Sequence, residues 1–113
     1  MSGMKILCVE NRPEDMAVLE HMLERIGYEV MQAINGGEAV DLFSKQAIDG
    51  VLLEYNLPDA TGAAIREQLK AIRPDIPVLL FTGVGTQTPF MLRFFDAYLR
   101  DRRTFRDALM EDA

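Results

Sequence analysis

The stretch GVLLEYNLPDATG, residues 50–62, decides the fold of this chain. An apolar run ends in a carboxylate at Glu54, and a loop with Pro58 and Gly62 leads into a helical pattern. A continuous apolar run is typical of a strand buried on both faces of a parallel sheet. A carboxylate at the end of such a strand is costly unless something uses it, so Glu54 is the first candidate for function.

The remaining chain alternates short apolar runs with longer amphipathic ones. With the strand over 48–54, strands are predicted at 4–9, 28–34, 78–82 and 96–100. The helices predicted between and after them cover 13–26, 39–43, 63–72, 90–94 and 104–110. This order predicts an α/β fold with a doubly wound, five-stranded parallel sheet and helices on both faces.

In such a sheet the functional site lies at the carboxyl ends of the strands. Polar residues follow four of the five predicted strands, and we expect them to lie near one another. They are Glu10 and Asn11 after the first strand, Glu54 after the third, Thr82 after the fourth, and Arg100 and Asp101 after the fifth.

Composition narrows the class of protein. The 113 residues suffice for one compact domain, so we expect a single domain over 1–113. The net charge of -6 argues against binding to nucleic acid or anionic membranes. A single cysteine, Cys8, cannot form an internal disulfide, so we expect a reducing compartment and a place for Cys8 in the core. No apolar segment suits a signal peptide or a membrane span, so we expect a cytoplasmic protein. His21 is predicted at the surface, and no His/Cys cluster suits zinc.

Five segments together carry a family resemblance: ILCVEN, GYEVMQAINGGEAV, DGVLLEYNLPDATG, PVLLFTG and AYLR. Through them the chain resembles the receiver domain of bacterial response regulators, the CheY-like, flavodoxin-like module of two-component signalling. The resemblance implies a sheet of order 2-1-3-4-5. It also implies a phosphoryl group taken from a histidine kinase by an aspartate at the end of the third strand, with Mg²⁺ held by an acidic pair.

When the family's site positions are matched to this sequence, the positions are found but several of their side chains differ from those of the family. The phosphoacceptor position is Glu54, the acidic pair is Glu10 and Asn11, the switch positions are Thr82 and Tyr98, and the lysine position is Asp101. Glutamate moves the carboxylate by roughly 1 Å, a displacement that can cost about 100-fold in rate. Asn11 carries no charge for Mg²⁺, and Asp101 adds repulsion where a lysine would neutralise the phosphoryl group.

Several residues keep more than one interpretation. Glu54 is a phosphoacceptor, a mimic of the phosphorylated state, or a paired carboxylate that does neither. Thr82 bonds Glu54 or caps its loop, and Tyr98 is a two-position switch or a half-buried edge residue. The basic cluster near the C-terminus is a solvated helix face or a candidate partner face; it comprises Arg100, Arg102, Arg103 and Arg106.

The sequence therefore predicts an atypical, phosphorylation-independent receiver, or pseudo-receiver, that acts in a phosphorelay as a protein-interaction module and not as an enzyme. Its expected partner is a protein, either a sensor histidine kinase or an output protein, with no nucleic acid or membrane. The alternative is a Mg²⁺-dependent receiver still phosphorylated by a histidine kinase, on Glu54 or another carboxylate such as Asp59. No cofactor is expected beyond a weak Mg²⁺ site at Glu10 and Glu54. Flavin or nucleotide binding is disfavoured because no glycine-rich phosphate cradle follows a strand.

Overall fold

Four strands and four helices make up the computed structural model, which describes the backbone of residues 3–111 and the side chains as far as Thr104. The elements follow one another in strict alternation. They are β1 (Lys5–Val9), α1 (Pro13–Ile26), β2 (Glu29–Ala33), α2 (Gly36–Lys45), β3 (Gly50–Glu54), α3 (Gly62–Ile72), β4 (Val78–Phe81) and α4 (Thr88–Glu111).

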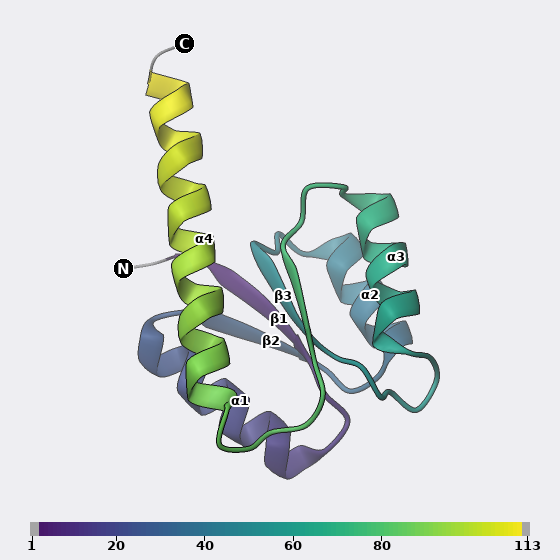
Figure 1. Ribbon diagram of the computed structural model, residues 1–113. Helices are drawn as coiled ribbons and strands as arrows, with labels where there is room; N and C mark the ends of the chain where they lie inside the picture. The colour runs from purple at the N-terminus through teal and green to yellow at the C-terminus, as the bar shows by residue number, and fades with distance from the viewer. Residues whose placement is uncertain (1–2, 112–113) are drawn as a thin grey trace.

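The strands form one parallel sheet in the order β2-β1-β3-β4. Residues that alternate along a strand point to opposite faces, and this divides the core into two clusters. Ile6, Cys8 and Leu52 face α1 and α4, whereas Leu7 and Leu53 face α2 and α3. Figure 1 shows the resulting three layers, with α1 and α4 on one side of the sheet and α2 and α3 on the other. The predicted α/β class, a parallel sheet with helices on both faces, is confirmed.

Local chemistry explains where the helices begin and end. Pro13 opens α1 and needs no amide partner there, and Gly27 ends it with a left-handed φ of 114°. The Asn35 side chain accepts a hydrogen bond from the Glu38 amide at the start of α2. Thr61 does the same for Ala64 at the start of α3. The Asn35 and Thr61 caps thus fix where the loops after β2 and β3 end.

The predicted fifth strand at 96–100 was wrong, and with it the five-stranded order 2-1-3-4-5. These residues lie inside α4, which also absorbs the two short helices predicted at 90–94 and 104–110. The physical reason is spacing: Leu92, Phe95 and Leu99 recur at i, i+3 and i+7, and all three are buried against the sheet. Within the described residues β4 is therefore an edge strand.

None of the described helices is long and apolar enough to cross a membrane.

Candidate functional site

Glu54 lies at the carboxyl end of β3 and only 5% of it is exposed. Both carboxylate oxygens accept hydrogen bonds from backbone amides. Oε2 accepts from Asn56 in the loop after β3, and Oε1 accepts from Gly83 in the loop after β4, each at 2.9 Å. Bonds from amides to a carboxylate are stronger than bonds between neutral groups. The side chain thus ties two loops together at the end of the sheet.

Glu10 follows β1 and is even more buried, with 1% exposed. Its Oε2 accepts from the Arg12 amide at 3.0 Å, whereas its Oε1 is buried with no hydrogen-bond partner within the described part of the chain. Burial, joined by the negative charge of Glu54, raises the pKa of Glu10 above its ordinary value, against the lowering effect of the Arg12 amide. The two carboxylates follow the neighbouring strands β1 and β3 at the same edge of the sheet, where the sequence pattern places them. The sequence pattern did not show that one oxygen would lack a partner.

Thr82 and Asn11 are exposed at the same end of the sheet. Among the described side chains, the bonds to Glu54 come from backbone amides and none comes from the Thr82 hydroxyl. The loop after β4 is instead capped by Thr88, which is buried and whose Oγ1 accepts from the Gly85 amide at 2.9 Å. Asn11 directly precedes Arg12, the N-cap of α1.

Asp59 has a structural role that the sequence did not reveal. Its two carboxylate oxygens accept hydrogen bonds from the Gly36 and Gly37 amides, at 2.8 and 2.9 Å, at the start of α2. These two bonds lower the pKa of Asp59 below its ordinary value. A carboxylate is stabilised near the positive end of a helix dipole. Through these two hydrogen bonds Asp59 anchors the loop after β3 to the start of α2.

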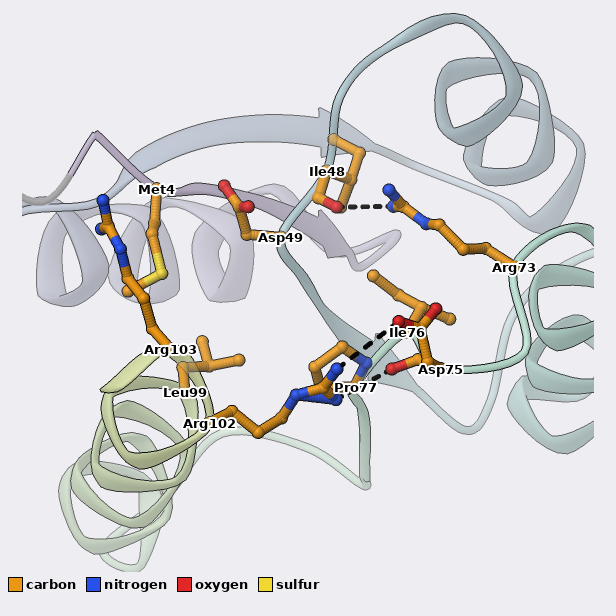
Figure 2. Close-up of a pocket in the computed structure, with 10 residues that line it drawn as sticks. All are labelled: Met4, Ile48, Asp49, Arg73, Asp75, Ile76, Pro77, Leu99, Arg102 and Arg103. Carbon is orange, nitrogen blue, oxygen red and sulfur yellow. Dashed lines mark hydrogen bonds and ion pairs between the residues drawn. The ribbon is translucent and has the colours of Figure 1, made fainter. Parts of the chain in front are cut away.

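Tyr98 and Asp101 lie on α4 and not at the end of a fifth strand. Tyr98 is 48% exposed and lines a groove beside Pro77 and Val78, at the amino end of β4. Leu99 and Arg102, which lie close to Asp101 in sequence, are near Asp49 at the amino ends of the strands (Figure 2). The helix thus carries this segment to the end of the sheet opposite Glu54.

The C-terminal arginines make contacts within the domain. Arg100 pairs with Asp96 at 2.8 Å, and Asp96 also accepts a hydrogen bond from the Tyr28 hydroxyl. Arg102 donates to the Asp75 carbonyl at 2.8 Å and its guanidinium lies 3.7 Å from the Asp75 carboxylate. Figure 2 shows Arg102 reaching across from α4 to Asp75, with Arg103 beside Met4. The Arg106 side chain lies outside the described residues.

The buried cysteine and the exposed histidine are as predicted. Cys8 is fully buried in β1, and His21 is exposed on α1.

Comparison with known proteins identifies the family. A family model described as "Response regulator receiver domain" matches residues 6–101, and the chain belongs to this family. Receiver domains are signalling modules of two-component systems, so the predicted class of protein is confirmed.

One relative and two solved neighbours illustrate the likeness. The chain is 33% identical to sporulation initiation phosphotransferase F of Bacillus subtilis over 85 residues, which is 75% of this chain and 68% of that protein. A CheY-like receiver from Methanospirillum hungatei superposes with a TM-score of 0.80 at 20% identity, over 91% of this chain and 98% of the other, and supports the fold alone. TrrA of Thermotoga maritima, solved in complex with Mg²⁺ and BeF, has a TM-score of 0.69 at 27% identity, over 74% and 73% of the two chains.

Several other curated relatives are longer, and the chain spans about a third of their length.

The family implies a Mg²⁺ site, and the residues present fit such a site only in part. Mg²⁺ in proteins is held by one or two carboxylates with several waters. Glu10 and Glu54 provide two carboxylates, and the unpartnered Oε1 of Glu10 is a suitable ligand atom. Within the described residues no group of three or more His, Cys, Asp or Glu side chains gathers as a metal site. Both oxygens of Glu54 already accept hydrogen bonds from backbone amides, so a cation has to compete with these amides for the carboxylate.

Proposed function

We propose that this chain is a receiver that signals without phosphorylation at Glu54, as a protein-interaction module in a two-component or phosphorelay pathway. The observation that supports this proposal best is that both oxygens of the Glu54 carboxylate accept hydrogen bonds from backbone amides. A nucleophilic oxygen has to approach an incoming phosphorus atom in a defined geometry. Here each oxygen instead points at a backbone amide of a different loop.

Charge supports the same conclusion. A phosphoryl group adds about -1.5 to -2 charges at neutral pH. It would arrive beside Glu10, which is buried, acidic and without a full set of partners. Asp101, at the position where the family resemblance implies a lysine, brings no positive charge and lies on a segment that α4 carries toward the opposite end of the sheet. Phosphoryl transfer depends on charge neutralisation, so these residues disfavour it.

Glu54 has a conformational role in this proposal. By bridging Asn56 and Gly83 it holds the loops after β3 and β4 in one arrangement. This supports both the mimic and the paired-carboxylate interpretations over the acceptor interpretation. The domain would then present a constant surface to its protein partner, a sensor histidine kinase or an output protein. TrrA, the Thermotoga maritima neighbour, has been solved in complex with the histidine kinase ThkA.

One observation favours the alternative, a Mg²⁺-dependent phosphoacceptor. The buried Oε1 of Glu10 lacks a partner, and a cation beside it would compensate the charge. The other carboxylate considered as an acceptor, Asp59, is an unfavourable choice because both of its oxygens hold α2.

The test is a backbone amide NMR titration with Mg²⁺ and then beryllofluoride, which imitates an acyl phosphate on a receiver carboxylate. We expect the amides of Asn56 and Gly83 in the wild type to stay unshifted by beryllofluoride. The matched variant Glu54→Asp withdraws the carboxylate by one methylene and frees the Gly83 amide, so we expect it to respond. A wild-type response that spreads from Gly83 along the loop after β4 would establish the phosphoacceptor instead.

A further inference from the structure

Within the described backbone, residues 3–111, no strand pairs with the outer edge of β4. Pro77 and Phe81 direct their carbonyls toward β3, where they accept from the Val51 and Tyr55 amides. Alternation along a parallel strand then places the N–H and C=O groups of Val78 and Leu80 on the opposite, outer side. At the amino end the Ile76 carbonyl is capped by the Lys70 ammonium. Exposed strand edges are templates for pairing with another extended segment.

A groove of about 260 Å³ runs along this edge between α3 and α4. In Figure 1 the green segment that contains β4 passes between these two helices. The wall on the α4 side is aromatic, with Phe94 62% exposed and Tyr98 48% exposed one helical turn apart. Phe90, 68% exposed, continues the same stripe one turn earlier. Three large exposed aromatic side chains in one row mark an interaction surface.

The wall on the α3 side is basic. The charged residues that line the groove are Arg66 and Lys70, in a chain whose net charge is -6. Arg66 has an exposed ion pair with Glu67 at 3.8 Å, which is weak competition for another carboxylate. Burial, and then the positive charges of Arg66 and Arg102, lower the pKa of Lys70. Arg66 and Lys70 thus give this wall two basic side chains that can meet an acidic one.

We propose that the β4 edge binds an extended segment of a partner protein in which apolar and acidic residues alternate. The segment adds a strand beside β4 and pairs with the outward groups of Val78 and Leu80. Side chains of a strand point alternately to its two faces, so one set packs on Phe94 and Tyr98 while the other meets Arg66 and Lys70.

A second copy of this chain fits the edge less well. Two copies that pair through β4 about a twofold axis place the same patch opposite itself. The basic walls of the two α3 helices would then face each other, because both copies present Arg66 and Lys70. Like charges across an interface disfavour association. An acidic partner segment removes this conflict.

This inference names a partner class for the interaction role proposed above and rests on that role. Its test can fail separately, because it reports on β4 and does not involve beryllofluoride. The probe is a capped peptide of about seven residues that alternates Glu and Val. Added to the ¹⁵N-labelled chain, it is expected to shift the amides of Val78 and Leu80 and to slow their hydrogen exchange.

Three comparisons make the test specific. A peptide with Lys in place of Glu is expected to bind roughly tenfold more weakly or worse. Arg66→Glu is expected to weaken the Glu peptide to a similar degree. The matched control Arg25→Glu, an exposed arginine in the last turn of α1, leaves the affinity unchanged. Equal binding of the Glu and Lys peptides would overturn the charge argument.

Backbone pairing is tested in the peptide, so that β4 stays intact. One peptide is N-methylated at every Glu and a second at every Val. Only one of these two sets of amides faces β4 in a given strand direction, so one peptide is expected to lose binding and the other to keep it. Equal effects of the two methylations, or no shifts at β4 at millimolar peptide, would overturn the proposal. Concentration-dependent shifts of Val78 and Leu80 without peptide, with dimers in sedimentation, would assign the edge to a second copy.

Discussion

The contact between the start of α3 and the end of β3 is close enough to predict the effect of a single methyl group. Gly62 is the first residue of α3, and its amide donates to the Tyr55 carbonyl at 2.6 Å. A Cβ built at Gly62 would lie 2.6 Å from the Glu54 carbonyl oxygen and 2.8 Å from the Tyr55 Cα. Both atoms belong to the backbone and cannot rotate away. Gly62→Ala therefore has to separate α3 from β3.

The expected cost follows from two opposing terms. Overpacking of a well-packed site costs about 1–3 kcal/mol. Alanine gains about 0.5–1 kcal/mol over glycine in a helix interior, and less at the first position. The net destabilisation of Gly62→Ala is thus about 1–2 kcal/mol. At roughly 4–8 °C per kcal/mol for a domain of this size, the Tm falls by about 5–15 °C.

The assay is thermal unfolding followed by circular dichroism, with Gly85→Ala as the matched control. A Cβ at Gly85 meets no heavy atom within 4 Å, so this variant is expected to stay within about 0.5 kcal/mol of wild type. The NMR spectrum of Gly62→Ala should also show a shifted Gly83 amide, because Glu54 moves with the end of β3. A Gly62→Ala variant that unfolds at the wild-type temperature would refute the close approach of α3 to β3.

Three further predictions concern the core and two titratable groups. Phe95→Ala removes a ring that is 3% exposed and should lower the free energy of unfolding in urea by about 3–5 kcal/mol. Phe94→Ala, on the exposed side of α4, should lower it by less than about 0.5 kcal/mol. Similar costs for the two variants would contradict the register of α4. Because the pKa of Asp59 is lower in the folded state, its stabilisation is present above the ordinary carboxyl pKa of ~3.9 and is lost as pH falls through the folded value. Asp59→Asn should therefore lose less stability on acidification than wild type, and an identical acid response would count against the α2 contact. Burial raises the pKa of Cys8 to about 12, so a thiol reagent at pH 8 should label it only after denaturant is added.

The sheet and the position of Glu54 could be predicted because their signals are local. The strands β1, β3 and β4 come from short apolar runs, whereas β2 is the mixed segment EVMQA, and Glu54 stands where the run of β3 ends. Parallel topology then places Glu10 and Glu54 on neighbouring strands at the same edge. Pro13 and Gly27 bound α1 through their own backbone restrictions.

Three features could not be predicted from local sequence: the helical state of 96–100, the Asp59 contact and the link from Glu54 to Gly83. They depend on contacts between distant segments, or on a segment whose side-chain spacing suits both a strand and a helix. The short apolar segment 96–100 predicts a strand by itself, but Phe95 and Leu99 continue a helical stripe from Leu92, and the helix forms. Asp59 binds amides more than twenty residues away in sequence, and no local pattern marks that contact. The link from Glu54 to Gly83 depends on the conformation of the loop after β4, which sequence periodicity does not define.

The position of α4 after all four described strands has a consequence for synthesis on the ribosome. Leu92, Phe95 and Leu99 complete the same core cluster as Ile6 and Cys8, near the start of the chain. About 90 residues separate these partners, so at ~5–20 residues per second the part of this face that α4 covers stays exposed for roughly 5–20 s, although α1 already packs on the same face. During that interval the emerging chain presents an apolar surface to chaperones and to its neighbours on the same messenger. Because α4 is made after all four described strands, its synthesis sets the earliest moment at which this core cluster can be complete.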